Sequence, residues 1–382
     1  MAGELGPNRD LIGISGGRAR LCTPALVLDL DVLDRNLAAM AAHCRGAGLA
    51  LRPHAKSHKS VAIARRQIEA GAIGICCATI REAEAMVGAG IAGVLITSPV
   101  TGPAKVERLM ALHTETDSLM VVTDGPDNAD ALARAAARAV PARPLAVVVD
   151  FDVGLHRTGA ATEDEVAVLA QRIEDCDSLA VAGVQAYAGH LQHVADFDER
   201  AAQMTIETGR LRAAVARLAE IGLEPAIVTG GGTGTHDIDH RDGVFTELQA
   251  GSYVFTDVQY NAVALRRDQA RPFEPALFVQ ASVVSTVHDS HAVIDAGLKS
   301  FATDGPAPVF SDGVADGVQY QFMGDEHGAV VYGQVNERLK VGEAVSCLVP
   351  HCDPTVNLYD HYHCVQGDTL VDIWPVDARG NP

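Results

Sequence analysis

The segment Leu145-Ala146-Val147-Val148-Val149-Asp150-Phe151 is one of eight short apolar runs that lie between residues 49 and 252. Amphipathic stretches such as 81–87, 126–139 and 200–219 separate the runs, and this alternation is typical of βα units around a parallel sheet. Because a closed barrel buries every strand edge, eight strands at about 25 residues per unit favour a (β/α)8 barrel over an open sheet. We expect its strands at 49–53, 73–78, 93–97, 118–122, 145–151, 182–187, 226–229 and 247–251.

A different pattern begins after Pro272, where short alternating segments are separated by glycine-rich turns. Examples are the segments 276–284, 292–295, 329–332 and 343–348, and the pattern is typical of an antiparallel sheet. The 382 residues of the chain exceed what a single ordinary core fills. We therefore predict an α/β protein with two domains, a barrel over 33–265 and a smaller β domain over 266–382.

The composition narrows the classes of partner. Hydrophobic residues make up 48% of the chain, but no apolar run approaches the roughly 20 residues that span a bilayer, so we expect no membrane partner. The formal net charge of -19 repels phosphate backbones, which argues against nucleic acid. Residues 1–7 lack the basic and apolar segments of a secretory signal, and we expect a cytoplasmic protein.

A basic cluster, Arg52-Pro53-His54-Ala55-Lys56-Ser57-His58-Lys59, follows the first expected barrel strand. The carboxyl ends of barrel strands form the active-site face, so these side chains are placed for function. Lys56 is the candidate nucleophile. A lysine amine attacks a carbonyl only when it is neutral, and the cationic neighbours in this cluster could lower its pKa. A solvated basic loop is the alternative interpretation.

A glycine-rich loop, Thr229-Gly230-Gly231-Gly232-Thr233-Gly234-Thr235, follows the seventh expected strand. Glycines such as Gly231 and Gly232 let backbone amides approach an anion closely, and barrels commonly bind phosphate in the loops after strands seven and eight. Its place in the chain favours a phosphate site, although such a sequence alone is also typical of a flexible turn.

A third motif, Val349-Pro350-His351-Cys352-Asp353-Pro354, lies in the expected β domain. A His and an Asp separated by one residue in an extended segment point to the same side, as two metal ligands must. The sulfur of Cys352 would then point away, which favours Mn²⁺ or Mg²⁺ with waters over a soft zinc centre. On spacing alone, a His-x-Asp pair is more often structural.

Taken together, these segments resemble the family of D-threonine aldolases, D-3-hydroxyaspartate aldolases and D-serine dehydratases, which are pyridoxal-phosphate enzymes with the alanine racemase barrel. The resemblance covers nearly the whole chain and is strongest to the D-threonine aldolases. Besides the three motifs above, it rests on Cys22-Thr23-Pro24-Ala25-Leu26-Val27-Leu28-Asp29, Gln185-Ala186-Tyr187 and Leu248-Gln249-Ala250-Gly251-Ser252-Tyr253.

The resemblance implies a cofactor site and a metal site. Pyridoxal 5'-phosphate would be bound by Lys56, Arg157, Tyr187, Thr233, Gly251 and Ser252, with the last three on the phosphate. The family's aldolases carry His-x-Asp and use manganese or magnesium, whereas its dehydratases carry His-x-Cys and bind zinc, so His351 and Asp353 imply Mn²⁺ or Mg²⁺. The resemblance also implies that the strand at 25–30, with residues 1–32, joins the C-terminal β domain. Two chains would pair head to tail as a homodimer with shared sites.

The activity that the resemblance implies is cleavage of a D-β-hydroxy-α-amino acid, such as D-threonine, to glycine and an aldehyde. The metal would lower the pKa of the β-hydroxyl, and His193 is the candidate base. The nearest rival is cleavage of D-3-hydroxyaspartate, whose second carboxylate needs a cation such as Arg20, His190 or Lys59.

Two further alternatives stay open. Dehydration of D-serine is disfavoured by Asp353, because the dehydratases carry cysteine at this position. A cofactor carrier without turnover is disfavoured by the β domain and its metal motif, because simple carriers resemble the barrel alone.

Overall fold

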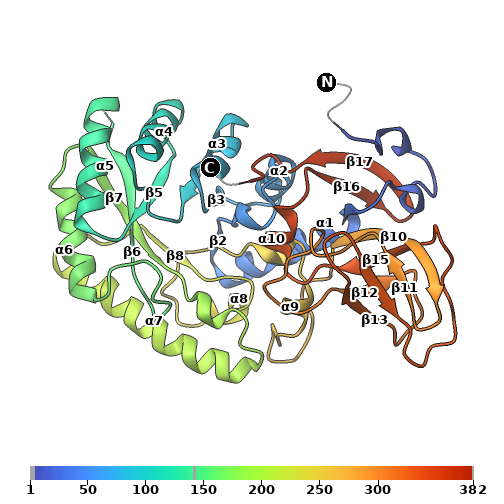
Figure 1. Ribbon diagram of the computed structural model, residues 1–382. Helices are drawn as coiled ribbons and strands as arrows, with labels where there is room; N and C mark the ends of the chain where they lie inside the picture. The colour runs from blue at the N-terminus through green and yellow to red at the C-terminus, as the bar shows by residue number, and fades with distance from the viewer. Residues whose placement is uncertain (1–4, 141–142, 381–382) are drawn as a thin grey trace.

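The computed structural model describes residues 5–140 and 143–380, which form two sheets (Figure 1). The first sheet is parallel, and its eight strands pair in the order β2-β9-β8-β7-β6-β5-β4-β3. A parallel bridge between His54 and Cys76 joins the two ends of this order. Beside it, the Cys76 amide donates to the Pro53 carbonyl at 2.9 Å. The predicted (β/α)8 barrel is confirmed.

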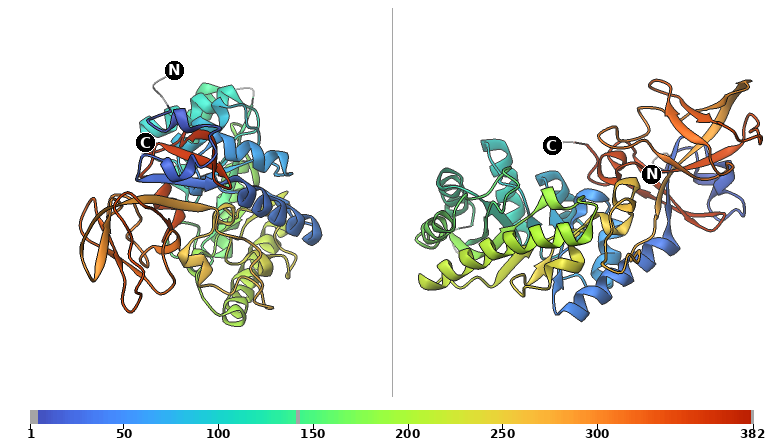
Figure 2. Two further views of the ribbon diagram at one scale, coloured as in Figure 1. Left: turned by 90° about the vertical axis from the view of Figure 1, so that its right-hand side faces the viewer. Right: turned by 90° about the horizontal axis from the view of Figure 1, so that it is seen from below.

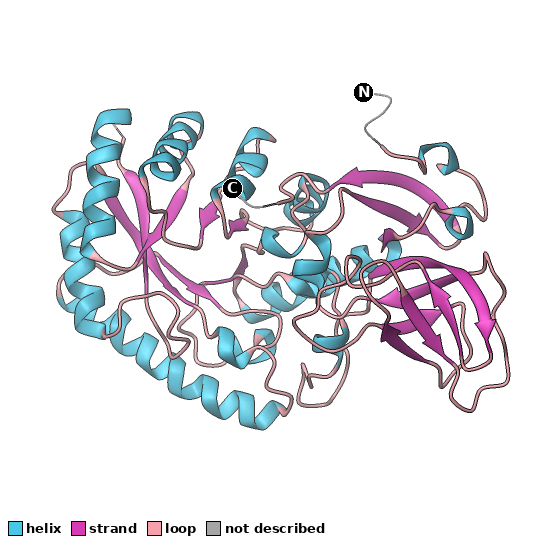
Figure 3. Ribbon diagram, viewed as in Figure 1, coloured by secondary structure: helices cyan, strands magenta, loops and turns pink. Residues whose placement is uncertain are grey.

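Every predicted barrel strand overlaps an observed one. The strands are β2 (Ala50–Leu51), β3 (Cys76–Cys77), β4 (Leu95–Ile96), β5 (Met120–Thr123), β6 (Leu145–Asp150), β7 (Leu179–Ala186), β8 (Ile227–Gly230) and β9 (Glu247–Leu248). The helices between them are α2 (Val61–Glu69), α3 (Ile80–Gly88), α4 (Pro103–Glu115), α5 (Pro126–Ala139), α6 (Glu163–Glu174), α7 (Phe197–Glu220) and α8 (His236–Asp239). Figure 3 shows the longer helices on the outer face of the barrel.

The helices begin where the sequence supplies caps. At the start of α6, the Thr162 side chain accepts from the Glu165 amide, and the Glu165 side chain accepts from the Thr162 amide, both at 3.2 Å. This reciprocal capping box satisfies two donors that the first turn would leave unpaired. Helix α1 (Leu30–Ala47) begins at Asp29, which accepts from Val32, and ends at Gly48 with a left-handed φ of 71°. Such signals are local, so the sequence predicts them well.

The second sheet is antiparallel except for one parallel pair. Its strands are β1 (Ala25–Asp29), β10 (Leu277–His288), β11 (His291–Ile294), β12 (Val309–Asp312), β13 (Gln319–Phe322), β14 (Gly328–Val331), β15 (Ala344–Leu348), β16 (His361–Gln366) and β17 (Thr369–Pro375). Strand β1 lies between β10, which is antiparallel to it, and β16, which is parallel. The expectation that the first strand joins the C-terminal domain is therefore confirmed.

The two sheets lie side by side, and α1 connects β1 of the second sheet to β2 of the barrel (Figure 2). One hydrophobic cluster contains Leu33 of α1, Tyr253 after the last barrel strand and Val279 of β10. Because this core runs across the sequence limits given above, the boundaries 33–265 and 266–382 with 1–32 stay a prediction. Residues 1–4, at the start of the segment inspected for a secretion signal, lie outside the described residues.

Short elements gather where the barrel strands end. They are η3 (Ala55–Ser57), η4 (Gly189–Leu191), η5 (Ser252–Val254), α9 (Val258–Asn261) and α10 (Cys352–Val356), while η1 (Arg9–Leu11) and η2 (Arg18–Arg20) precede β1. Helix α10 packs against η3, which brings the third motif of the sequence onto the loop that carries Lys56. Among the described residues, no helix combines the length and the apolarity needed to cross a bilayer.

Candidate active site

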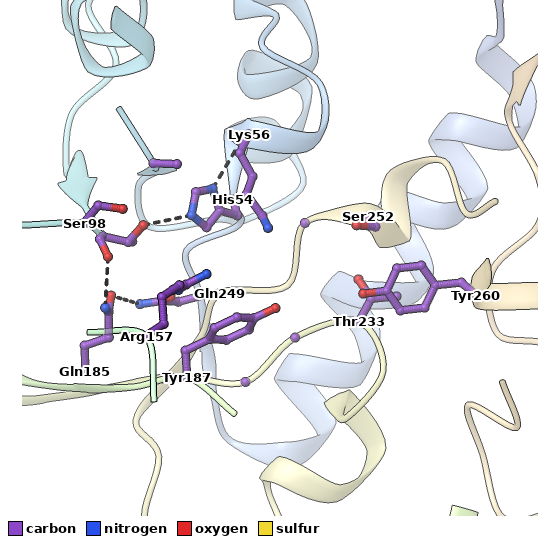
Figure 4. Close-up of a pocket in the computed structure, with 15 residues that line it drawn as sticks. His54, Lys56, Ser98, Arg157, Gln185, Tyr187, Thr233, Gln249, Ser252 and Tyr260 are labelled. Carbon is purple, nitrogen blue, oxygen red and sulfur yellow. Dashed lines mark hydrogen bonds between the residues drawn. The ribbon is translucent and has the colours of Figure 1, made fainter. Parts of the chain in front are cut away.

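A pocket opens at the carboxyl ends of the barrel strands, and its side chains come from loops that follow several different strands (Figure 4). About 600 Å³ of empty space lies inside it, counting its open mouth, which is in the range of small-molecule sites. All the cofactor-binding residues predicted from the sequence line this pocket, namely Lys56, Arg157, Tyr187, Gly231, Gly232, Thr233, Gly251 and Ser252. The fold thus gathers residues that are up to two hundred positions apart in the chain.

The Lys56 ammonium faces a carboxylate from the other domain. Lys56 Nζ lies 3.4 Å from Oδ2 of Asp353, and the lysine side chain is 39% exposed through the pocket mouth. The negative charge of Asp353 raises the pKa of Lys56, and this effect outweighs the opposing effect of burial. Burial acts to raise the pKa of Asp353, but the charges of Lys56 and His351 hold it below its ordinary value.

The expectation that cationic neighbours lower the pKa of Lys56 is wrong. Arg52 forms a buried ion pair with Glu247 at 2.9 Å, and Lys59 forms one with Glu82 at 2.8 Å. Their charges are therefore neutralised by carboxylates that the local sequence did not reveal. Burial lowers the pKa of His54 well below its ordinary value, so its ring is neutral beside Lys56.

The glycine-rich loop and the loop after β9 present backbone donors to the pocket. In the part of the chain that the structure describes, the amides of Thr233, Gly251 and Ser252 donate to no protein acceptor. Leaving such groups unpaired in a buried position is costly, so they are suited to an anion. The hydroxyl of Thr233 accepts from the Tyr253 amide at 3.0 Å, which leaves its own proton free to donate.

Gly231 meets a strict steric requirement in this loop. Its φ is 67°, and a Cβ at this position would lie 2.3 Å from Oδ2 of Asp239. A side chain is excluded both by the left-handed backbone and by the buried carboxylate behind it. The second glycine of the motif, Gly231, is therefore required for a defined structural reason.

A polar network that the sequence did not predict forms the wall of the pocket (Figure 4). Gln249 donates to Gln185 Oε1 at 3.0 Å, and Gln185 donates to the carbonyl of Thr97 at 3.1 Å. His54 Nε2 lies 2.9 Å from the hydroxyl of Thr97. Arg157 stacks over the ring of Tyr187, with 5.7 Å from its guanidinium carbon to the ring centroid. These contacts fix the side chains before any ligand binds.

His351 and Asp353, the predicted metal ligands, interact electrostatically, but the local geometry of this pair differs from the expectation. Only His351 is extended, since Asp353 is already in the first turn of α10. The Cys352 sulfur does not point away from the pair but lies 3.3 Å from Oδ1 of Asp353. Burial raises the pKa of the Cys352 thiol well above its ordinary value, so it remains a protonated, poor metal ligand. The preference for a hard cation stays a prediction, now because the thiol is protonated rather than because it points away.

The ring of His351 is held by a residue that sequence reasoning missed, because its Nδ1 lies 2.8 Å from Oδ2 of Asp304. Within the described ranges, no group of three or more His, Cys, Asp or Glu side chains is arranged to hold a metal. A cation at this place would therefore have His351 and Asp353 as its protein ligands and complete its shell with water or substrate oxygen.

His193 does not itself line the pocket, but its ring centroid is 4.6 Å from that of Tyr260, which does. Partial desolvation lowers the pKa of His193, and the nearby His351 lowers it further. A neutral imidazole at this position can accept a proton near neutral pH. Its catalytic role stays a prediction.

Comparison with known proteins agrees with this geometry. Residues 28–258 match the model of the alanine racemase N-terminal domain, and residues 276–365 match that of a putative serine dehydratase domain. The chain is 39% identical to the D-threonine aldolase of an Arthrobacter species, over 95% of this chain and 94% of that protein. The chain belongs to the alanine racemase-like aldolase family.

Two other members of this aldolase family are as similar. The 3-hydroxy-D-aspartate aldolase of Paracoccus denitrificans is 38% identical over 94% of this chain and 92% of its own length. The crystal structure of D-threonine aldolase from Filomicrobium marinum superposes with a TM-score of 0.90 at 40% identity, covering 94% of this chain and 96% of that one. Relatives named as dehydratases are more distant, at 28% identity or less.

The alanine racemase-like fold of this aldolase family implies pyridoxal phosphate, and the pocket fits it. The unpaired amides near Thr233 and Ser252 suit the phosphate, and the lysine amine lies in the same pocket. The donors at the proposed metal site are also suitable for a divalent cation. They are the imidazole of His351, which is hydrogen-bonded to Asp304, and the ionised carboxylate of Asp353.

Proposed function

We propose that this chain cleaves D-β-hydroxy-α-amino acids of the D-threonine type to glycine and an aldehyde. In this proposal pyridoxal 5'-phosphate is attached to Lys56, and a divalent cation, Mn²⁺ or Mg²⁺, is held by His351 and Asp353. The observation that carries the proposal is the 3.4 Å approach of Lys56 Nζ to Asp353 Oδ2. One pocket can therefore serve both the α-amino group and the β-hydroxyl of a single small substrate.

When bound, the cofactor supplies an electron sink for the carbanion left by carbon–carbon cleavage, and the cation acidifies the β-hydroxyl. The chain's own residues do the rest. The amides of Thr233, Gly251 and Ser252 would hold the phosphate, and Arg157, which stacks on Tyr187, would lie beside the ring. His193, whose pKa is lowered, accepts the hydroxyl proton at a ring nitrogen, either directly or through a water.

Cleavage of D-3-hydroxyaspartate is the second candidate, because a 3-hydroxy-D-aspartate aldolase is 38% identical to this chain. Of the three cations considered for its extra carboxylate, Lys59 is committed to Glu82 in a buried pair. Neither Arg20 nor His190 lines the described pocket. None of these three cations therefore lines the pocket, and the substrate assay separates the two candidates.

Dehydration of D-serine is disfavoured by two observations. Asp353 stands where the dehydratase motif has cysteine, and Cys352 beside it is a buried thiol with a raised pKa. Relatives named as dehydratases are also more distant than those named as aldolases. A carrier without turnover is disfavoured because the similarity to aldolases extends over both sheets.

The proposal extends to assembly and location, as a homodimer with shared sites in the cytoplasm. On the second sheet, Val284 and Val287 of β10 are 44% and 81% exposed. Isolated apolar side chains are common on surfaces, so the oligomeric state is checked by light scattering on the purified protein. A monomer at assay concentration would contradict the shared-site arrangement.

The function is tested by incubating the purified protein with D-threonine, D-3-hydroxyaspartate and D-serine, each with EDTA and with added Mn²⁺. We expect glycine from D-threonine at the highest rate, and loss of this activity in EDTA. Faster glycine release from D-3-hydroxyaspartate would select the second candidate. Pyruvate and ammonia from D-serine, without glycine from either other substrate, would overturn the aldolase proposal.

A further inference from the structure

Asp304 lies in the segment between β11 and β12, 47 residues before His351 in the chain. Its Oδ2 accepts a hydrogen bond from Nδ1 of His351 at 2.8 Å. In a neutral imidazole the proton is then on Nδ1, and the lone pair of Nε2 is free to bind a metal. We infer that Asp304 is a positioning residue, which orients His351 and fixes its tautomer for a divalent cation shared with Asp353. This inference rests on the metal site of the proposed function.

The loop that carries Asp304 is fastened to the same turn as the two ligands. The amide of Ala302 donates to the hydroxyl of Thr355 at 3.0 Å, and that hydroxyl donates to the carbonyl of His351 at 2.7 Å. Thr355 belongs to α10, as does Asp353. A displacement of α10 would therefore move the Asp304 loop with it. These hydrogen bonds thus keep the Asp304 carboxylate next to the His351 imidazole.

Packing against α9 restricts this loop from its other side. A Cβ built on Gly305 would lie 2.2 Å from the terminal side-chain nitrogen of Gln259, so the backbone next to Asp304 contacts the Gln259 side chain of α9. Ala302, on the opposite side of Asp304, is buried. The carboxylate is thus held by a supported loop, which is the arrangement expected of an outer residue that orients a metal ligand.

The alternative is an ordinary surface ion pair. The Asp304 side chain is 53% exposed and that of His351 is 23% exposed, and pairs of this kind contribute little to stability. The two interpretations differ in what they predict for metal binding. A surface pair has no effect on metal affinity, whereas loss of a carboxylate behind a metal-binding histidine typically weakens affinity by about 10- to 100-fold.

The test is a Mn²⁺ titration of cofactor-loaded protein from which metal has been removed by a chelator, with free Mn²⁺ measured by electron paramagnetic resonance. We expect Asp304→Ala to raise the Kd for Mn²⁺ by about 10- to 100-fold. Asp304→Asn should raise it less, because the amide oxygen still accepts from Nδ1 although the charge is lost. Asp316→Ala, an exposed aspartate of the same domain, is the matched control and should leave the Kd unchanged.

The His351→Ala variant distinguishes a failure of the positioning role of Asp304 from a failure of the proposed metal site. If it abolishes Mn²⁺ binding while Asp304→Ala binds as the wild type does, Asp304 has no positioning role and the proposed metal site stands. If His351→Ala itself binds Mn²⁺ as the wild type does, the metal site and this inference are both overturned. Melting temperatures of all variants, measured without metal, show whether each protein is folded.

Discussion

Gln192 donates a hydrogen bond from its side-chain amide to the hydroxyl of Thr235, at 3.1 Å, in the buried interior beneath the glycine-rich loop. The same side chain accepts from the amide of Gly234 at 2.9 Å. Thr235 in turn accepts from the amide of Gly232 at 3.2 Å. One glutamine therefore braces the loop that we propose binds the cofactor phosphate, and it directly precedes the candidate base, His193.

Gln192→Ala should weaken cofactor binding. The substitution leaves the buried Gly234 amide without a partner, which typically costs about 1–3 kcal/mol, so we expect the Kd for pyridoxal 5'-phosphate to rise by roughly 5- to 100-fold. Absorbance titration of the cofactor-free protein measures this. Gln203→Ala, on the exposed face of α7, is the control. An unchanged Kd in Gln192→Ala would show that the loop keeps its shape without the brace.

Lys59→Met should destabilise the fold without removing the cofactor. Its ammonium lies 2.8 Å from Glu82, whose side chain is 1% exposed, and breaking a buried pair on one side typically costs about 3–5 kcal/mol. Denaturant unfolding should therefore show a clear loss of stability, and Lys59→Met with Glu82→Gln should recover part of it. Loss of the cofactor band at unchanged stability would instead give Lys59 a direct role in the pocket.

Acid should destabilise the protein through two buried histidines. Burial lowers the pKa of His58 to about 4 and that of His236 to about 3. Unfolded imidazoles titrate near 6.5, so below that pH the unfolded chain binds more protons than the folded one. Stability is then lost as the pH falls from about 6.5 towards about 3.

Denaturant midpoints measured between about pH 7 and about pH 4 check this dependence. His236→Gln removes one of the two groups, and its midpoint should fall less steeply over the same range. A parallel fall in variant and wild type would assign the acid sensitivity to other residues.

Asp353→Asn should speed loading of the cofactor onto metal-free protein near neutral pH. The Asp353 charge raises the pKa of Lys56, and only the neutral amine attacks the aldehyde of the cofactor. Removing the charge lowers the pKa of Lys56 and enlarges the reactive fraction. Stopped-flow absorbance after mixing with pyridoxal 5'-phosphate measures the rate. A slower reaction in the variant would mean that the Asp353 carboxylate assists the attack, for example by taking up the ammonium proton.

The sequence predicted what depends on local pattern. The eight barrel strands and the loops bearing Lys56 and Thr233 follow from apolar periodicity and from the order of the βα units, whereas the place of β1 in the second sheet was implied by the family resemblance. Residues that act through distant partners were missed. Nothing near Arg52 in the chain indicates that Glu247 neutralises it, and Asp304 is a single exposed aspartate in a loop until the fold places it on His351.

The backbone conformation of the metal motif could also not be predicted from the sequence pattern. The one-residue spacing of His351 and Asp353 suggested an extended segment, whereas Asp353 lies in the first turn of α10, whose N-terminal amide is capped by a tertiary contact. The Cys352 amide donates to Asp257, a buried residue of the barrel domain, at 2.9 Å. A cap supplied from 95 residues away leaves no signal in the local sequence.

The attachment of the cofactor to Lys56 is tested most directly by reducing the loaded protein with borohydride and mapping the modified peptide by mass spectrometry. We predict that the reduced cofactor is found on the peptide containing Lys56, and that Lys56→Ala carries none. A label on Lys59 or on any other lysine, or a loaded protein that yields no labelled peptide, would contradict the account.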